Sequence, residues 1–355
     1  MGLGEDMCLL GDVDGDFVAD IAVTCAHYPE GEHARREVWL LSGRTGKTLR
    51  IVRPEADSMG HAHLGNRLAP IGDIDGDRVS DFAVIGTIAR PERSSVWGAL
   101  AISGADGCVL RRFIAQVAEP EFYPTALCGV EDWDGGGTPD VAVGGTLSGD
   151  GLRGAVAIFS AESGALVAML QGGPGHQRFG RTIVRWRERA TTERLGILVS
   201  STFVRTTSHG PRDVVSVITG RSRATSLVAE GGEVDCGFGR AICWITGRQT
   251  GPCLVVAEPD AAGKVGPFAG AVVAIDSGTL NPLWRSQSPL PHASFGEALA
   301  SCPDLDGDGV TELVVGAPRA NSRRTSPTDD RGTVYVLSGK SGEQLLALEP
   351  TGHRK

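Results

Sequence analysis

Three short segments of the chain place acidic side chains at a spacing that suits a divalent cation. Counted from the first aspartate of each segment, carboxylates stand at positions 1, 3, 5 and 9, and position 7 offers a backbone carbonyl. Carboxylates packed this closely repel one another unless a cation lies among them, and an all-oxygen ligand set favours a hard ion such as Ca²⁺. The predicted ligands are Asp12, Asp14, Asp16, Val18 and Asp20; Asp73, Asp75, Asp77, Val79 and Asp81; and Asp304, Asp306, Asp308, Val310 and Glu312.

A fourth segment is a partial copy of the same pattern. It keeps Asp132, Asp134 and Asp140, but position 5 is Gly136. We therefore expect weak calcium binding there, or none. The spacing overlaps the start of an EF-hand loop, but position 12 is a valine in all three complete segments and a strand-like run follows, so the EF-hand interpretation is rejected.

The acidic segments belong to a repeat of about 59 residues. Its clearest mark is an outer turn, which reads Ser-Gly-x-x-Gly in three copies and a variant of it in the others. The mark lies in successive copies around Gly43, Gly104, Ala161, Gly220, Ser277 and Gly339. Six copies fill the chain, which predicts a single domain over residues 1–355. The expected copies span about 1–59, 60–119, 120–176, 177–236, 237–293 and 294–355.

Each copy has the pattern of four short strands and three turns. In the last copy "ELVVGA" is a continuous apolar run typical of a strand buried on both faces, and "TVYVLSG" alternates and ends in a glycine turn. A four-stranded unit of this size cannot bury its own faces, so radial repetition is the expected solution. The prediction is an all-β, six-bladed β-propeller with four antiparallel strands per blade.

Several short motifs resemble the FG-GAP repeat of integrin α-subunit propellers. They are "FG" at Phe179, Phe238 and Phe295, the aspartate-rich loops, and "VVGAP" at residues 314–318. The resemblance implies a propeller with calcium in the loop between the first two strands of a blade, acting in adhesion or in binding a protein or glycan partner. Integrin α propellers have seven blades, so a seventh blade supplied from outside this chain is the alternative.

Charge and hydropathy narrow the range of partners and compartments. A net charge of -9 argues against nucleic acid as the partner, and the chain contains no apolar run long enough for direct membrane insertion. The weak calcium affinity of extracellular modules favours a secreted or cell-surface location. The absence of a signal-peptide pattern and the irregular spacing of the cysteines keep the cytoplasm as an alternative. We expect a monomer or part of a larger polypeptide.

The loops expected between the second and third strands are rich in arginine. Binding groups usually lie on such loops, and guanidinium groups suit anionic ligands. One hypothesis is that these loops bind an anionic glycan or protein patch; the other is that the arginines are solvated and balanced by nearby acidic residues. The residues concerned are Arg35, Arg36, Arg90, Arg93, Arg205, Arg212, Arg323 and Arg324.

Enzymatic activity is not expected from this sequence. None of the histidines lies beside a nucleophile motif, a zinc-ligand spacing or a phosphate-binding loop. A carbohydrate-binding lectin propeller is the runner-up, and a propeller hydrolase or lyase with a site at the channel mouth comes third. A likeness to quinone-binding propellers is confined to "GAVVAIDSGTLNPLW" and carries less weight.

Overall fold

The computed structural model describes most of the chain, in two compact units. The described residues are 2–27, 35–53, 64–89, 95–115, 121–149, 153–173, 175–186, 196–205, 210–219, 224–233, 235–247, 251–320 and 332–349. The first unit comprises Met1–Gly173 and Arg178–Arg185, and the second comprises Pro174–Gln177 and Trp186–Lys355.

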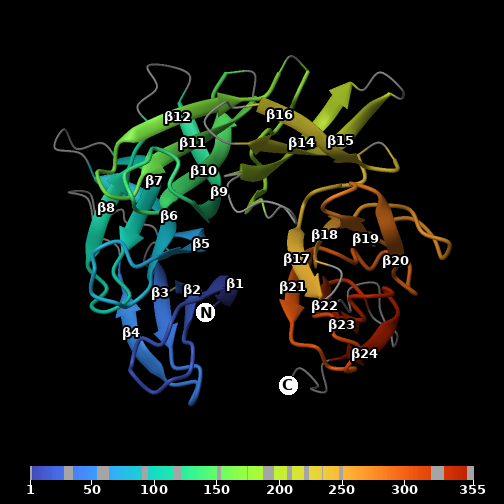
Figure 1. The fold of residues 1–355 in the computed structure, drawn as a ribbon, viewed down its shortest axis with the longest axis horizontal. Coiled ribbons are helices and arrows are strands. Elements are labelled where there is room, and N and C mark those ends of the chain that lie inside the picture. Colours follow the sequence, from blue (N-terminus) through green and yellow to red (C-terminus); the bar gives the residue numbers. More distant parts are fainter. Residues whose placement is uncertain are drawn as a thin grey trace. The chain divides into compact units, whose positions relative to one another are not determined.

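The described residues form six four-stranded antiparallel sheets, and within each sheet the strands are ordered as in the chain (Figure 1). Each sheet falls inside one of the six predicted ranges, so the chain is an all-β, six-bladed β-propeller, as predicted. None of the described residues belongs to a helix long and apolar enough to cross a membrane. The single domain over residues 1–355 stays a prediction.

The first unit contains three complete blades and the first strand of the fourth. Its strands are β1 (Gly2–Leu9), β2 (Ile21–His27), β3 (Arg35–Leu41) and β4 (Thr48–Val52); β5 (Leu64–Gly72), β6 (Asp81–Ala89), β7 (Ser95–Ile102) and β8 (Val109–Phe113); β9 (Phe122–Val130), β10 (Asp140–Leu147), β11 (Gly154–Ser160) and β12 (Leu166–Gln171); and β13 (Ile183–Arg185).

The second unit contains the rest of blade four and blades five and six. Its strands are β14 (Gly196–Arg205), β15 (Pro211–Thr219) and β16 (Ala224–Glu230); β17 (Ile242–Gly247), β18 (Gly251–Glu258), β19 (Ala271–Asp276) and β20 (Pro282–Gln287); and β21 (Ala298–Cys302), β22 (Glu312–Ala317), β23 (Thr333–Leu337) and β24 (Gln344–Leu348).

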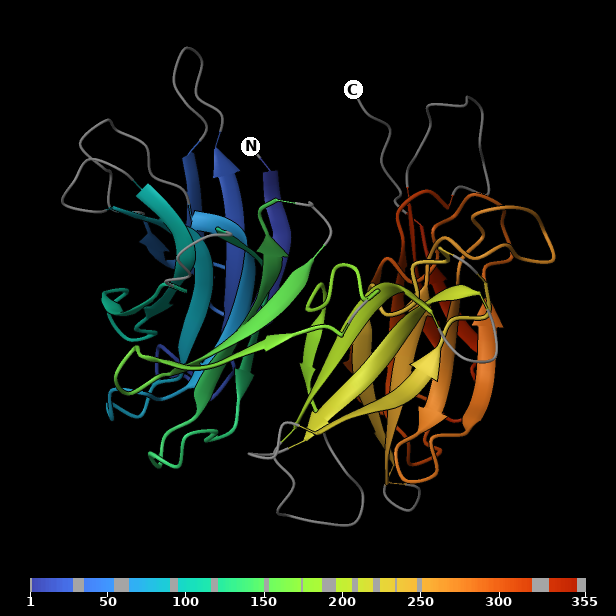
Figure 2. The same cartoon turned by 90° about the horizontal axis from the view of Figure 1, so that it is seen from above.

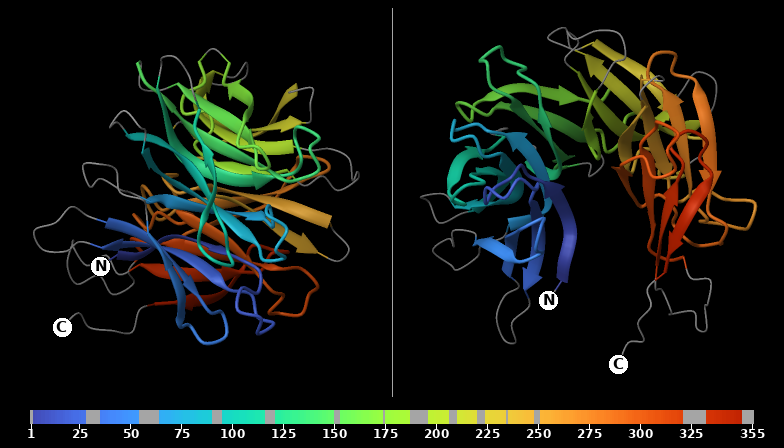
Figure 3. Two further views of the ribbon diagram at one scale, coloured as in Figure 1. Left: turned by 90° about the vertical axis from the view of Figure 1, so that its left-hand side faces the viewer. Right: turned by 60° about the horizontal axis from the view of Figure 1, so that its bottom comes forward.

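The hydrophobic pattern of each strand follows its place in the blade. The central strand β11 is buried along its whole length, whereas the outer strand β12 is exposed at both ends and alternates between half-buried and buried residues in between. The four strands of blade one, in blue, run side by side as one twisted sheet (Figure 2), and those of blade six, in orange and red, do the same (Figure 3). Central strands covered on both faces read as continuous apolar runs, as the sequence predicts.

Neighbouring blades of a unit bury their faces against each other. In the first unit Phe113 of blade two and Phe159 of blade three lie with ring centroids 5.5 Å apart. In the second unit Phe295 and Tyr335 make an edge contact at 5.3 Å, within a core that also contains Val255 of blade five. Aromatic pairs at such distances add to the free energy gained by apolar burial.

The outer strand of one blade also holds the outer turn of the next. Arg50 donates to the carbonyl of Gly104 at 3.2 Å, Arg111 to that of Glu162 at 2.6 Å, and Trp284 to that of Gly339 at 3.0 Å. These donors occupy the same position of the repeat. The turns therefore have fixed positions relative to the blade before them.

Candidate metal centre in the acidic loops

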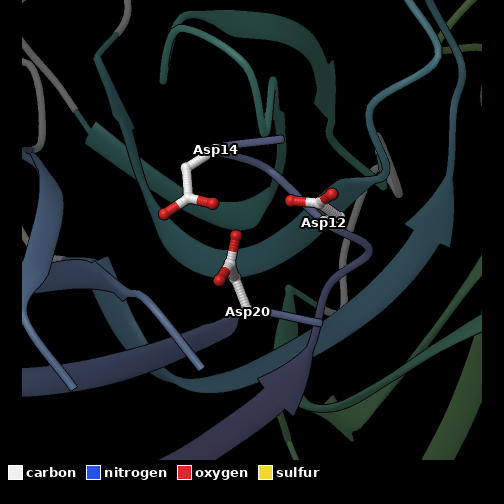
Figure 4. Close-up of side chains that lie close together, drawn as sticks. All are labelled: Asp12, Asp14 and Asp20. Carbon is white, nitrogen blue, oxygen red and sulfur yellow. The ribbon is translucent and has the colours of Figure 1, made fainter. Parts of the chain in front are cut away.

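Four loops that join the first and second strands of a blade each bring three carboxylates together. In each group, one oxygen from each side chain lies within 4.8 Å of the other two. The groups are Asp12, Asp14 and Asp20; Asp73, Asp75 and Asp81; Asp132, Asp134 and Asp140; and Asp304, Asp306 and Asp308. In blade one the three carboxylates converge from a single hairpin (Figure 4).

The aspartate at position 1 shapes the loop. The Asp12 carboxylate accepts backbone hydrogen bonds from Gly15 at 2.7 Å and from Phe17 at 2.7 Å. Hydrogen bonds from the backbone favour the ionised form, and the bond from Phe17 contributes most to holding the pKa of Asp12 below its usual value. Asp73 and Asp132 have pKa values lowered in the same way. Position 1 is thus a carboxylate kept charged by the loop that surrounds it.

The carboxylate at position 3 lies near that of position 1 but accepts fewer backbone hydrogen bonds. Asp14 accepts one backbone hydrogen bond, from Asp16 at 3.2 Å. Its pKa is raised, first by desolvation and then by the negative charges of Asp16 and Asp20. The acidic side chains of this loop therefore oppose one another's ionisation, and a cation placed among them would relieve that repulsion.

Position 9 carries a buried carboxylate that joins two parts of its blade. Asp20 is fully buried; one of its oxygens accepts from the backbone N–H of Val13 at 2.7 Å and the other from that of Gly43 at 2.9 Å. Asp81, Asp140 and Glu312 are equally buried and make the equivalent pairs of bonds. Burial raises the pKa of Asp81 and of Asp140 to about 6.

This bridge explains why a glycine marks the outer turn. A Cβ atom on Gly339 would lie 2.0 Å from the carbonyl oxygen of Thr311, so only glycine lets the turn approach Glu312 closely enough to donate at 2.8 Å. Blade three has Ala161 at this position, and there the bond from its N–H to Asp140 is stretched to 3.4 Å. The glycine of the repeat mark is therefore required by a close backbone contact.

The four groups do not use the same positions. Blades one, two and three gather positions 1, 3 and 9, and the predicted ligands Asp16 and Asp77 lie outside the group. In blade six, position 5 (Asp308) joins the group in place of Glu312. Glutamate is one methylene longer than aspartate, and here its carboxylate spans from Leu305 to Gly339 as a brace. The carbonyls of Val18, Val79 and Val310 remain predicted ligands.

Blade three brings its three carboxylates together as blades one and two do. Position 5 lies outside the group in those two blades, so Gly136 does not by itself set blade three apart. The reason for expecting weaker binding at Asp132, Asp134 and Asp140 was the missing fourth carboxylate. Geometry among the three that remain provides no such reason.

Sequence reasoning missed a basic residue beside the loop of blade one. Arg44, in the outer turn of that blade, donates from Nε to Asp16 at 2.9 Å and from a terminal nitrogen to the Asp16 carbonyl at 2.6 Å. The available signal was its place directly after the Ser-Gly mark, since the Asp20 bridge brings that turn against the acidic loop. Arg44 therefore neutralises one of the four acidic side chains of blade one.

Blade five has none of these carboxylates and closes differently. Cys253 occupies the place of the position 9 acid, and the hydroxyl of Ser277 donates to the carbonyl of Pro252 at 2.7 Å. The hairpin is also tied to blade six, because the backbone N–H of Thr246 donates to the Thr311 hydroxyl at 2.8 Å. Neutral hydrogen bonds thus replace the acidic loop in this blade.

The arginines predicted to bind a ligand are only partly described. Arg36 pairs with Glu5 at 2.6 Å, and Arg212 donates to the carbonyl of Gly232 at 2.7 Å. The other members of the predicted set cannot be placed: the side chains of Arg35 and Arg205 and the whole of Arg90, Arg93, Arg323 and Arg324 lie outside the described residues.

Blade six begins with a buried Phe-Gly pair, and this segment matches a known repeat family. Phe295 is buried, and a Cβ atom on Gly296, which has a φ of +99°, would lie 3.0 Å from Ala257 Cβ. The FG-GAP repeat family matches residues 295–337, from this Phe-Gly pair through the acidic loop to the end of β23. This segment of blade six is similar to an FG-GAP repeat. Together with the six blades, the FG-GAP repeat is consistent with a propeller of the integrin-α type and supports a general role as a binding or adhesion scaffold.

Proposed function

We propose that this protein is a calcium-stabilised binding scaffold that recognises a protein or glycan partner through loops between its strands. The observation that carries the proposal is the recurrence of one arrangement, three converging carboxylates in the loop after the first strand, in four blades. Asp-Gly clusters also make ordinary turns. Here each of four loops brings carboxylate oxygens within 4.8 Å of one another, which is better explained if each loop binds a cation of its own.

The donor set fits calcium better than other common ions. Every side-chain donor is a carboxylate oxygen, with a backbone carbonyl expected at position 7, and hard oxygen ligands suit Ca²⁺ or Mg²⁺. Irregular loops with several carboxylates favour Ca²⁺, since Mg²⁺ requires near-octahedral geometry and keeps its waters. A bound cation would also offset the mutual repulsion that raises the pKa of Asp14 and the burial that raises those of Asp81 and Asp140.

The role proposed for calcium is structural. Each acidic loop closes a hairpin and, through position 9, holds the outer turn of its own blade. A cation there would stabilise the end of the blade opposite the longer loops between the second and third strands, and so would keep the strands that carry those loops in place. A rigid scaffold of this kind lowers the conformational entropy lost when a partner binds.

The partner and the compartment follow from the same proposal. Calcium sites of extracellular modules have dissociation constants of about 10⁻⁴ to 10⁻³ M, which suits a secreted or cell-surface protein. The arginine-bearing loops are the proposed contact region, and the more specific proposal is that they bind an anionic partner. Arg36 and Arg212 already bind groups of the protein itself, so the other arginines of the set are the proposed contacts with that partner.

Thermal unfolding with and without calcium tests the proposal. We expect the melting temperature to rise with millimolar Ca²⁺ and to fall in chelator. When the free Ca²⁺ concentration is about ten times the Kd of a site, binding at that site adds about 1.4 kcal/mol to the free energy of unfolding. Replacing the position 3 residues Asp14, Asp75, Asp134 and Asp306 by Asn keeps an oxygen in place and should abolish the calcium effect. An unchanged melting temperature in chelator would contradict the proposal. A partner screen on glycan and protein arrays with Ca²⁺ present would then identify the ligand.

A further inference from the structure

Blade three has an acidic side chain beside the loop position where its own carboxylate is missing. Position 5 is Gly136, and the outer turn of the same blade carries Glu162. A Cβ atom built on Gly136 would lie 3.3 Å from Glu162 Oε2 and 2.9 Å from Asp134 Oδ1. The Glu162 carboxylate therefore reaches the loop at the point from which a position 5 side chain would start.

The turn that carries Glu162 is held on several sides. The N–H of Gly164 donates to the carbonyl of Ser160 at 2.8 Å, which closes the turn on itself. Arg111 of blade two donates to the Glu162 carbonyl at 2.6 Å. Because the backbone is fixed from both its own blade and the preceding one, the Glu162 side chain starts from a defined point and faces the loop.

The same turn position faces loop position 5 in blade one. There it carries Arg44, whose Nε donates to the Asp16 carboxylate at 2.9 Å. Blade two has Ala105 and blade six has Lys340 at this position. The residue that follows the Ser-Gly or Ser-Ala mark can thus add or remove charge at the acidic loop of its own blade. Of the four blades with acidic loops, blade three alone has glutamate there, and it alone lacks an acidic residue at position 5.

We propose that Glu162 supplies, beside the group of Asp132, Asp134 and Asp140, the acidic charge that position 5 supplies beside the group of blade two, so that blade three binds calcium as strongly as blade two. This inference rests on the proposed calcium function and assigns to the site an acidic residue that the linear motif does not contain. It restores the count of four acidic side chains found in the complete loops. Calcium affinity in oxygen-ligand loops rises with the number of charged ligands.

Trp133 makes the loop of blade three observable by itself. It stands between Asp132 and Asp134 and is 5% exposed, whereas the other acidic loops have Val13, Ile74 and Leu305 at that position. Terbium, a hard trivalent ion, takes oxygen ligands like those of calcium and emits when a nearby tryptophan is excited. Terbium emission that is lost in Trp133→Phe and displaced by calcium reports occupancy of blade three alone.

Three variants of the full chain, each compared with the wild type, decide the question. Glu162→Gln should weaken calcium at the Trp133-reported loop on the order of tenfold or more, the loss typical of changes around a metal ligand. Glu121→Gln, at the opposite end of the same blade, should leave it within twofold. Gly136→Asp added to Glu162→Gln should restore binding, because the backbone there is compatible with a side chain and the crowding atoms are the ends of flexible side chains.

The outcomes separate this inference from the proposed function. Equal affinity in Glu162→Gln and the wild type would overturn the role of Glu162 while leaving calcium binding intact. No Trp133-dependent emission, together with a calcium-dependent melting temperature, would likewise reject the site in blade three and keep the other loops. Absence of both effects would reject the two proposals together.

Discussion

Asp20 accepts a hydrogen bond from the backbone N–H of Gly43 at 2.9 Å, joining the loop after the first strand of blade one to the turn after the third. The second oxygen of Asp20 accepts from Val13 within the acidic loop. A carboxylate predicted as a metal ligand is therefore also a buried brace. The two roles can be separated by experiment.

Removing the brace should destabilise the protein even without calcium. Asp20→Ala leaves two buried or half-buried backbone N–H groups without their acceptor, which should lower the free energy of unfolding by about 2 kcal/mol or more in chelator. Chemical denaturation would measure this loss.

Asp14→Asn is the matched control for this experiment. It lies in the same loop and is exposed, so in chelator its effect should stay within about 0.5 kcal/mol. Equal losses in the two variants would show that position 9 has no bracing role distinct from the rest of the loop.

The close approach at the outer turn predicts a cost for one added methyl group. Gly339→Ala would place a Cβ atom 2.0 Å from the carbonyl oxygen of Thr311. The turn must then retreat from Glu312, and we expect a loss of about 1–3 kcal/mol, typical of forced overpacking. Lys340→Ala, at the next and exposed position, should be nearly neutral in the same denaturation experiment. A harmless Gly339→Ala would refute this explanation of the repeat mark.

Arg44 should weaken calcium at blade one. Its guanidinium occupies the Asp16 carboxylate and adds positive charge beside the loop. With the other three loops inactivated by Asn at Asp75, Asp134 and Asp306, Arg44→Gln should tighten calcium several-fold by calorimetric titration, since like charge near a cation site is removed.

The control for Arg44 is Arg53→Gln, which removes an arginine paired with Glu37 just beyond β4, away from the acidic loop. It should leave the calcium affinity of blade one unchanged. Weaker binding in Arg44→Gln would mean that the arginine supports the loop through its bond to the Asp16 carbonyl and does not compete with the ion.

One cysteine should show a pH-dependent reactivity set by its neighbour. Cys108 is the exposed cysteine of the eight. The Asp106 carboxylate accepts a hydrogen bond from the thiol and repels the thiolate, so it raises the pKa of Cys108. Asp106→Asn should lower that pKa, move the curve of alkylation rate against pH to lower pH, and speed labelling at neutral pH. Mass spectrometry would locate the label, and Cys108→Ser should abolish the fast phase. An unshifted curve would exclude control by Asp106.

The sequence predicted the blades well because their marks are physical. The spacing from Gly43 to Gly339 gave six copies, and each copy forms one four-stranded sheet. Gly43, Gly104 and Gly339 recur because in each of these blades a backbone carbonyl leaves no room for a side chain. The Phe-Gly pair was recognisable for a similar reason, because Phe295 is buried in the core of its blade.

The roles inside the loops were less predictable. A carboxylate at position 9 satisfies both a cation and two backbone N–H groups, so its type cannot reveal which role dominates. The contacts of Arg44 with Asp16 and of Glu162 with the Gly136 position join segments that are 28 and 26 residues apart. Such contacts appear only when the repeat is folded and the outer turn lies against the acidic loop.

The bond between Asp20 and Gly43 has a mechanical side. A force that peels the outermost strand of blade one from its sheet must move the turn that contains Gly43, and that turn is coupled to the acidic loop through the Asp20 carboxylate and through the pair of Arg44 with Asp16. Tension applied at the rim of the blade is thereby transmitted to its innermost hairpin. In a scaffold under tension between a partner and an anchor, this force would act first on the residues of the acidic loop, which are the proposed calcium ligands.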